Sequence, residues 1–539
     1  MIVKSKLTVG QPQEPMHTTI LRRCLEFHRD DPEREAFFST SDKTNAVTFK
    51  QVYDYSLNLA SWLLENDFKK GDVVLVCLRN SWHFIVACLG AWSAGLTVSA
   101  ASTLFTEYEY RYQLEDSTAK LIITEESLLS KLKKANRAGV RIICVSQQKH
   151  ANLDDFMAIV TKYPPVPVMP VYINLNEDLM LIAYSSGTTG APKGVMLTHG
   201  NFAYSLLGHI KKYDEIYSAQ GVDGYIPPPY VIAFLPFYHA MGLYNSFFTL
   251  HNGTTQITMA RFNLRELLQH IQDYHISFLL VVPSVILAMV ESPLLDSYDL
   301  SSLALIGSGA APLSQSVVDR LNQRLPDVRV VQGYGMTETS VASHIPTLSC
   351  PKGSVGTLLP NTEMKIISCG KSCGPYEKGE LWIRGPQIMK GYWKRPELTK
   401  EMFDSEGFMR TGDIAYYDKD GYTFICDRDK ELIKVDGRQV SPTEIEEVLI
   451  AHPKITDCCV IGVPDDKHGE VPLAFIVANS INEENIHAHV KERLAPFKRL
   501  RGGVKFLDVI PRTPTGKTLK RKLKDEYLKT VKPTQKSHI

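Results

Sequence analysis

The chain has 539 residues, more than one hydrophobic core usually supports, so two or more domains are expected. Its composition is that of an ordinary globular protein, and its ten cysteines show neither a disulfide framework nor zinc spacing, which favours reduced thiols in an intracellular compartment. The net charge is +1, but from Lys491 onward 15 Lys or Arg oppose 4 Asp or Glu; without a nucleic-acid motif, this basic end favours a membrane surface or a phosphate-rich small ligand over nucleic acid.

The first 150 residues alternate helical and strand-like patterns. Ser56–Glu65 has amphipathic spacing, and another helical stretch begins at Ser81. Short β-branched runs lie at Val73–Cys77, Ala119–Thr124 and Arg141–Val145. This alternation predicts an α/β fold with a large N-terminal domain of parallel-type sheets sandwiched by helices.

No segment predicts a transmembrane span. Met1–Lys6 lacks the long apolar core of a signal peptide. The longest uncharged run, Phe84–Thr106, is rich in Ala, Ser, Thr and Gly, and it fits a helix, a turn and a strand better than a membrane helix.

A glycine-rich segment, Tyr184–Gly194, follows the predicted strand Leu179–Ala183. It contains three glycines, four Ser or Thr hydroxyls and one lysine. Glycines let backbone N–H groups approach a ligand, and the hydroxyls and lysine add donors and positive charge, which together suit a polyphosphate. The spacing differs from that of the P-loop. A solvated surface loop is the alternative that the residues alone leave open.

Downstream strands carry further candidate residues at their ends. The predicted strand Val231–Pro236 leads to His239, which could line a pocket or be a hydrogen-bonded core histidine. A strand is also predicted at Phe278–Val282, and the small residues of Ala304–Leu313 leave room for a flat ring against the backbone. In Gln332–Thr339, an aromatic face, a hydroxyl and a carboxylate suit adenine, a phosphate and Mg²⁺, although a glycine turn before a capped helix is the alternative.

In this order the motifs resemble those of the adenylate-forming enzymes, which include acyl-CoA synthetases, coumarate–CoA ligases, beetle luciferases and peptide-synthetase adenylation domains. The resemblance covers roughly residues 45–525. One departure is Ala100–Thr106, which lacks an Asn-Pro that many relatives carry; we expect a changed loop there and unchanged chemistry. The resemblance implies an N-terminal adenylation domain at 1–428 and a small mobile α+β lid domain at 429–539.

The resemblance also implies roles for individual residues. Tyr334 would face adenine, Thr337 the α-phosphate and Asp413 the ribose hydroxyls; Glu338 would hold Mg²⁺, and Lys517, Thr337 and Glu338 would be catalytic. The full ATP- and AMP-binding set is Ser185, Ser186, Gly187, Thr188, Thr189, Gly190, Lys193, Gly309, Ala310, Ala311, Gly333, Tyr334, Gly335, Thr337, Asp413, Ile425, Arg428 and Lys517.

The C-terminal segment carries the remaining motifs. Lys430 matches the family's hinge position, and Lys434 and Gly437 would serve the thioester-forming half-reaction. Ser441–Glu444 predicts a capping box that opens a helix to about residue 450. Strands at 457–462, 473–477 and 504–509 and a helix near 483–494 follow. Pro511–Lys517 matches the family's Pro-x-x-x-x-Gly-Lys signature and precedes an amphipathic basic helix that runs through residue 529.

The resemblance implies an ATP-dependent acid–CoA ligase that forms an acyl-adenylate and transfers the acyl group to CoA, releasing AMP and pyrophosphate. ATP, Mg²⁺ and CoA are the implied cofactors and co-substrates, and a fatty or arylpropenoic acid is the expected substrate. The implied acyl pocket is His239, Met241, Ser308, Gly309, Gly333 and Val341. These residues are mainly small or apolar and do not suit the ammonium of an amino acid.

Two alternatives of function and one of location stay open. The same adenylation step could load a carrier protein, or it could feed a luciferase-like monooxygenase. The last three residues, Ser537, His538 and Ile539, keep the small–basic–aliphatic order of a Ser-Lys-Leu signal, which predicts a peroxisomal import receptor as a partner; cytosol is the alternative location.

Overall fold

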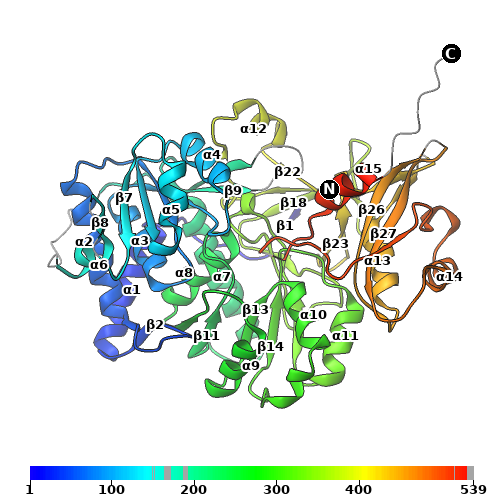
Figure 1. Ribbon diagram of the computed structural model, residues 1–539, viewed down its shortest axis with the longest axis horizontal. Helices are drawn as coiled ribbons and strands as arrows, with labels where there is room; N and C mark the ends of the chain where they lie inside the picture. Colours follow the sequence, from blue (N-terminus) through cyan, green and yellow to red (C-terminus); the bar gives the residue numbers. More distant parts are fainter. Residues whose placement is uncertain are drawn as a thin grey trace.

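The computed structural model describes residues 1–148, 150, 152–162, 171–185, 192–436, 438–465, 467–514 and 516–530. Among the described residues, a large body of five sheets ends near residue 428, and a smaller unit lies at one end of the molecule, coloured orange to red in Figure 1. Predicted site residues 186–190 and 437, and the C-terminal tripeptide 537–539, lie outside the described residues.

An eight-stranded sheet organises the first half of the chain. Its order is β21 (Gly391–Tyr392), β10 (Lys193–Thr198), β9 (Leu179–Ser185), β5 (Thr97–Ala100), β4 (Val73–Cys77), β6 (Leu121–Glu125), β7 (Arg141–Val145) and β8 (Asp154–Asp155). Strands β9 through β8 run parallel, whereas β10 and β21 run antiparallel at one edge.

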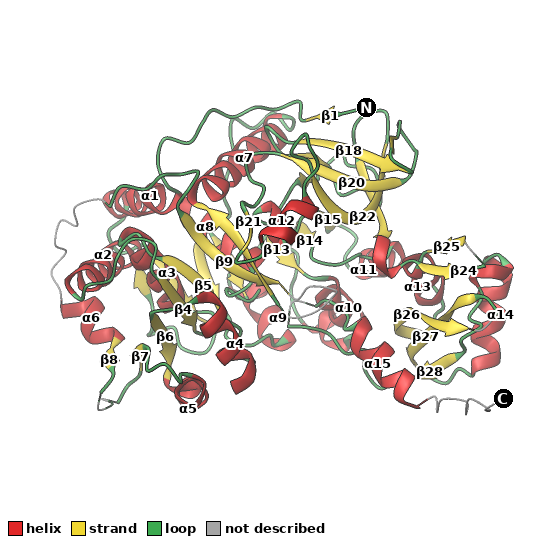
Figure 2. Ribbon diagram, turned by 90° about the horizontal axis from the view of Figure 1, so that it is seen from above, coloured by secondary structure: helices red, strands yellow, loops and turns green. Residues whose placement is uncertain are grey.

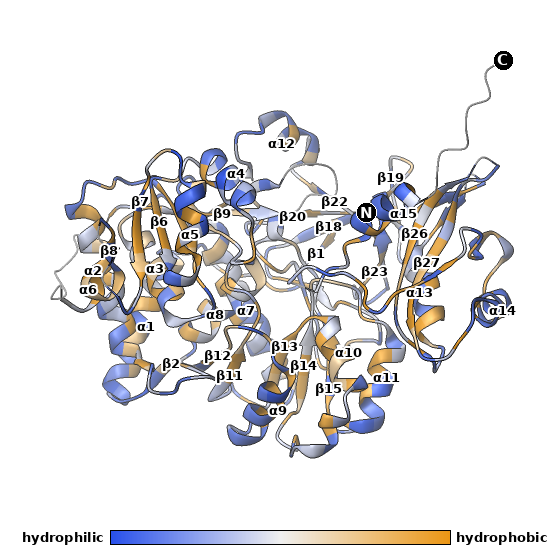
Figure 3. Ribbon diagram, in the orientation of Figure 1, coloured by the Kyte–Doolittle hydropathy of each residue, from blue (hydrophilic) through white to orange (hydrophobic). Residues whose placement is uncertain are grey.

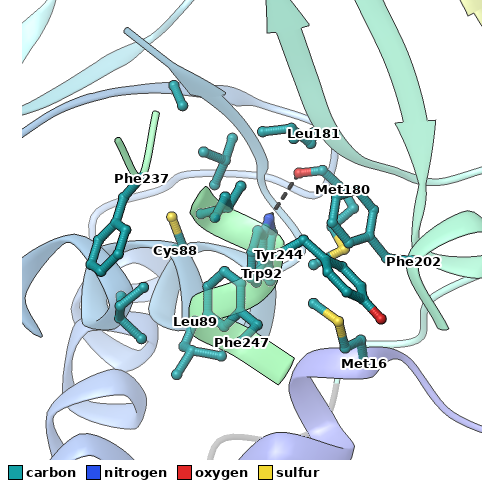
Figure 4. Close-up of a cluster of buried hydrophobic side chains, with 14 of the residues drawn as sticks. Met16, Cys88, Leu89, Trp92, Met180, Leu181, Phe202, Phe237, Tyr244 and Phe247 are labelled. Carbon is teal, nitrogen blue, oxygen red and sulfur yellow. Dashed lines mark hydrogen bonds between the residues drawn. The ribbon is translucent and has the colours of Figure 1, made fainter. Parts of the chain in front are cut away.

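Helices cover both faces of this sheet, as the alternating pattern predicts. Val74 and Val76 of β4 pack with α2 (Phe49–Glu65) and α3 (Trp82–Ser93), and the intervening Leu75 packs with α4 (Glu107–Ser117) and α5 (Glu126–Ala135). The first face is closed by Trp92, whose indole Nε1 donates to the Met180 carbonyl at 2.8 Å (Figure 4). The uncharged run 84–106 is thus a buried helix, a turn and a strand.

Two smaller sheets follow, and their strands are parallel except for one antiparallel edge strand at 47–48. One sheet has the order β11 (Tyr230–Ala233), β12 (Thr255–Thr258), β2 (Glu35–Ser39) and β3 (Val47–Thr48), and the other is β13 (Phe278–Val281), β14 (Leu305–Ser308) and β15 (Arg329–Gln332). The remaining α-helices of the first 330 residues are α1 (Met16–Asp30), α6 (Phe156–Lys162), α7 (His199–Ser218), α8 (Ala240–His251), α9 (Leu264–Asp273), α10 (Pro283–Glu291) and α11 (Gln315–Arg324), as seen from above in Figure 2.

A six-stranded antiparallel sheet completes the large body. It consists of β1 (Val3–Lys4), β18 (Glu363–Ser368), β19 (Lys371–Ser372), β20 (Gly379–Arg384), β22 (Met409–Tyr417) and β23 (Thr423–Arg428). In the sequence, α12 (Pro396–Met402) lies between β20 and β22. The segments η2 (Thr337–Thr339), β16 (His344–Ile345) and β17 (Thr357–Leu358) precede β18. Of this sheet, the family resemblance implies a strand at 379–385, which corresponds to β20.

The C-terminal unit is a separate α+β layer. Its strands are β24 (Ile433–Val435), β25 (Arg438–Val440), β26 (Ile455–Asp465), β27 (Gly469–Ala478) and β28 (Val504–Phe506), and its helices are α13 (Pro442–Ile450), α14 (Glu483–Arg493) and α15 (Lys520–Thr530). In Figure 3, β26, β27 and α13 are strongly hydrophobic and α14 is hydrophilic. The predicted boundary at 428/429 falls between β23 and β24 and stays a prediction.

Three local predictions need correction. The strand predicted at 231–236 ends at Ala233, because the next carbonyls turn toward the side chain of Asn80 and the start of α8. The strand predicted to reach residue 509 ends at Phe506. Ser441 caps α13 by accepting from Glu444 N at 3.1 Å, but the capping box is incomplete because the Glu444 carboxylate pairs with a lysine of the same unit.

None of the described helices is long and apolar enough to cross a membrane.

Candidate active site

One cavity of about 1900 Å³ collects most of the predicted site residues. It opens where β9, β14 and β15 end, which is where parallel α/β sheets commonly bind ligands. Its lining includes Ser185, Lys193, His239, Met241, Ser308, Gly309, Ala310, Gly333, Tyr334, Gly335, Thr337, Glu338, Val341, Arg428, Lys430 and Lys517. Segments that are hundreds of residues apart in the chain therefore meet around a single space.

Four predicted residues do not belong to this lining. Ala311 follows the lining residue Ala310, and Ile425 pairs with Ala415 in the antiparallel sheet and packs against the main core. Asp413 lies behind the lining, held by two residues that do line it. Lys434 is exposed on the C-terminal unit.

A buried carboxylate with two partners forms the first polar centre. Asp413 of β22 pairs directly with Arg428 of β23, and Arg428 Nε lies 3.2 Å from its Oδ1. The Tyr334 hydroxyl donates to Oδ2 of Asp413 at 2.5 Å. Burial raises the pKa of Asp413, and the charge of Arg428 opposes that rise. The link between Tyr334 and Asp413 was not predicted, because no local pattern connects residues so far apart.

A second buried carboxylate, Glu338, lies in the short helix η2. Its Oε1 accepts a hydrogen bond from the Tyr392 hydroxyl at 2.9 Å, and its side chain lies at the cavity wall. Burial raises the pKa of Glu338. Among the described residues no group of three or more His, Cys, Asp or Glu could hold a metal ion. One carboxylate nevertheless fits Mg²⁺, which commonly takes one or two protein carboxylates together with phosphate oxygens and water.

Backbone strain marks two of the loops that line the cavity. Ala310 has φ +69° after β14, and Val341 has φ +92° after η2. The left-handed region is uncommon for any residue with a Cβ atom and is an outlier for a β-branched one, and such strain clusters at ligand sites. Both positions belong to the predicted binding set.

Lys517 enters the cavity from the C-terminal unit. It ends a tight turn in which Thr513 N donates to Lys517 O at 2.8 Å. Gly516, with φ +78°, presses this turn against the large body: a Cβ there would lie 2.8 Å from the Val282 side chain. Burial lowers the pKa of Lys517, and the neighbouring charge of Arg428 lowers it further.

Lys517 also lies close enough to His239 to affect its charge. Burial is the main reason that the pKa of His239 falls to about 4, and the positive charge of Lys517 contributes. His239 is therefore neutral at pH 7 and stands at the N-terminus of α8 without a side-chain cap. The lining position of His239 agrees with a pocket residue rather than a residue confined to the core.

The cavity lining includes a group of aromatic side chains, which we call the aromatic chamber. Its walls include Tyr213 and Tyr217 of α7, Tyr244 and Phe248 of α8, and Tyr225. The rings of Tyr213 and Tyr225 are stacked with centroids 5.0 Å apart. Sequence reasoning missed this chamber, since aromatic residues four apart on a helix are more commonly core residues than pocket residues.

Comparisons with known proteins agree with this geometry. Residues 25–393 match the family model described as AMP-binding enzyme, and residues 444–517 match the AMP-binding enzyme C-terminal domain. The chain is 41% identical over 527 residues to acyl-CoA synthetase 7 of Caenorhabditis elegans, covering 96% of this chain and 97% of that one. It is 34% identical to 4-coumarate–CoA ligase 2 of Nicotiana tabacum, with 95% and 94% covered.

It is also 34% identical to luciferin 4-monooxygenase of Photinus pyralis, over 97% of this chain and 96% of that one. Among solved structures, ATP-bound MatB from Rhodopseudomonas palustris superposes with a TM-score of 0.83 at 26% identity, covering 95% of this chain and 99% of that chain. MenE from Bacillus subtilis, in complex with its acyl-adenylate intermediate, gives a TM-score of 0.79 at 27% identity, with 95% and 98% covered.

Proposed function

The chain belongs to the AMP-binding enzyme family and is an AMP-forming acid–CoA ligase, and we propose that it activates an apolar carboxylic acid, a fatty or arylpropenoic acid. The observation that carries the proposal is the cavity itself. Its lining combines polar and charged residues, Tyr334, Glu338, Arg428 and Lys517, with the aromatic chamber.

In the first half-reaction, the carboxylate of the acid attacks the α-phosphorus of ATP and pyrophosphate leaves. The acid needs no general base, because a carboxylic acid is ionised at neutral pH. Asp413, fixed by Tyr334 and Arg428, accepts hydrogen bonds from the ribose hydroxyls. The Lys517 ammonium and the Thr337 hydroxyl donate to the oxygens on which charge develops.

Glu338 is the proposed protein ligand of Mg²⁺, which supplies charge neutralisation on the phosphate oxygens when bound. The buried Glu338 carboxylate is held in one orientation by the Tyr392 hydroxyl. Lys193 lines the same part of the cavity and adds positive charge beside the phosphates. The charges of Lys193 and of the bound metal would act inside the cavity, where charges interact more strongly than in bulk water.

In the second half-reaction, the thiol of CoA attacks the acyl carbonyl and AMP leaves. Lys517 is inside the cavity, whereas Lys434 is exposed on the same C-terminal unit. We propose that the unit turns about Lys430, which withdraws Lys517 and brings the 434–437 segment to the adenylate. The basic C-terminal unit would also attract the phosphates of CoA.

The size and lining of the cavity support an extended apolar acid. A single small-molecule pocket is about 300–1000 Å³, so about 1900 Å³ has room for a nucleotide and a long acyl or aryl group. Gly309 leaves space beside Met241, because a Cβ at Gly309 would come 3.3 Å from the Met241 sulfur. Burying the ammonium of an amino acid among these residues would be costly.

The test is ATP- and CoA-dependent AMP release across a panel of free acids, from short to very long chains and including hydroxycinnamates. Wild type should turn over one band of acids, and Lys517→Ala should lose adenylation by about 10²–10³-fold. The same variant should still convert a supplied acyl-adenylate to acyl-CoA. AMP release that needs a carrier protein in place of CoA would refute the ligase proposal.

We also propose peroxisomal import through the C-terminal tripeptide, with a role in lipid metabolism. The support is the small–basic–aliphatic order of residues 537–539. Fusing the last dozen residues to a fluorescent reporter tests this: punctate signal is expected, and a diffuse signal from both the fusion and a version lacking the tripeptide would exclude it.

A further inference from the structure

Tyr392 lies at the edge strand that borders the phosphate-binding end of the cavity. Its strand, β21, pairs antiparallel with β10, which begins at Lys193. Beside it, Trp393 N donates to Gly194 O at 2.7 Å, and Tyr392 N itself donates to Thr399 Oγ1 at 2.9 Å. The backbone of Tyr392 is therefore fixed from both sides, by β10 and by α12.

The side chain of Tyr392 contacts two charged residues of the proposed site. Its hydroxyl donates to Glu338 Oε1 at 2.9 Å, and Lys193 Nζ lies 5.4 Å from the centroid of its ring. All three side chains line the cavity, and Tyr392 and Glu338 are both 6% exposed. One tyrosine thus joins a lysine at the end of the glycine-rich segment to a carboxylate that follows β15.

Both charged side chains need such support. Mg²⁺ requires nearly ideal octahedral geometry, so a flexible glutamate must be held in one orientation, and partners of a ligand carboxylate commonly supply this. A lysine is a point charge on a flexible four-carbon stem, and an aromatic face within about 6 Å attracts it.

We propose that Tyr392 is a positioning residue for adenylation: its hydroxyl orients Glu338 toward the metal–triphosphate, and its ring holds Lys193 beside the same phosphates. This inference rests on the proposed ATP-dependent function. The proposal predicts a different effect on ATP binding and on AMP binding, because AMP lacks the β- and γ-phosphates and binds without Mg²⁺. A tyrosine that only stabilised the fold would affect both nucleotides equally.

The experiment measures equilibrium binding to the full-length protein by titration calorimetry, with no acid or CoA present. The probes are ATP with Mg²⁺, ATP with EDTA, and AMP. Tyr392→Phe keeps the ring under Lys193 and removes only the hydroxyl, whereas Tyr392→Leu removes both contacts. Tyr417→Phe is the matched control, because Tyr417 is buried in the same domain, donates to Cys373 O at 3.4 Å and does not line the cavity.

Tyr392→Phe should weaken binding of ATP with Mg²⁺ roughly tenfold, the effect of a lost hydrogen bond to a charged group, and should raise the Mg²⁺ concentration needed for half-saturation. AMP binding and the melting temperature should match those of Tyr417→Phe. Tyr392→Leu should also weaken ATP binding in EDTA, because Lys193 loses its aromatic partner.

The inference is overturned if Tyr392→Phe binds ATP with Mg²⁺ as tightly as Tyr417→Phe does, or if ATP and AMP weaken in parallel. Failure of the proposed function looks different. Wild type would then bind nucleotide yet release no AMP with any acid in the panel, a result that leaves the comparison between Tyr392→Phe and Tyr417→Phe unchanged.

Discussion

Lowering the pH from 7.5 to 5.5 should destabilise this protein, because several histidines are buried in the neutral form. Burial is the first cause of each shift, and the pKa falls to about 4 for His83, His209, His239 and His251 and to about 3 for His199 and His344. In the unfolded chain the same side chains titrate near 6.5.

The sign and size follow from proton linkage. A folded-state pKa below the unfolded value gives stability that is complete above pH 6.5 and is lost as the pH falls toward the folded value. At pH 5.5 the unfolded chain holds most of one proton on each of these histidines and the folded chain holds almost none, which costs about 1.4 kcal/mol for each. Six such groups give an upper bound of about 8 kcal/mol, comparable with a typical total stability.

The assay is thermal unfolding followed by circular dichroism at pH 7.5 and 5.5, a window above the titration of ordinary carboxyl groups. The melting temperature should fall by on the order of 10 °C. His209→Phe should reduce this fall, because the phenyl ring cannot titrate and replaces a ring packed 4.7 Å from that of Tyr244. His487→Gln, at a partly exposed position of the C-terminal unit, should leave it unchanged. Equal melting temperatures at both pH values, or the same pH dependence in the two variants, would refute the reasoning.

Three further predictions concern the site. Tyr334→Phe removes a donor from the buried Asp413 carboxylate and should weaken AMP and ATP binding alike, by roughly tenfold in calorimetry; unchanged AMP affinity would contradict it. Gly242→Ala places a Cβ 2.3 Å from a backbone carbonyl, so it should lower the melting temperature and abolish turnover, and a fully active variant would show that α8 can shift. Asp427→Ala removes the acceptor of the Ser441 hydroxyl, a hydrogen bond of 2.6 Å that links α13 to β23. Adenylation should therefore slow several-fold, while the conversion of supplied acyl-adenylate to acyl-CoA should keep its rate. Equal slowing of both steps would contradict this prediction.

Sequence patterns predicted the parts of the fold whose signals are local. β4 and β7 have the predicted bounds, because runs of β-branched residues between turn signals become buried parallel strands. The antiparallel sheet as a whole was not anticipated, because β1 pairs with β18 and β20 pairs with β22 across long stretches of the chain. The contacts of Tyr334 and Tyr392 with distant carboxylates were also missed, since they depend on tertiary packing and leave no periodic signal.

The arrangement of the C-terminal unit bears on how one cavity could serve two half-reactions. Lys517 is buried in the cavity, whereas Lys434, the second residue of β24, is exposed. The unit is held in this position by the Asp427–Ser441 hydrogen bond and by the packing of α13 beside α11. Val440 and Ile445 of the unit belong to the same buried hydrophobic cluster as Leu321 of α11, and Gly516 lies against the Val282 side chain. The hydrophobic cluster around the eight-stranded sheet includes none of the described residues beyond 428, so the turn of the unit that we propose about the 428–432 link would leave that cluster intact.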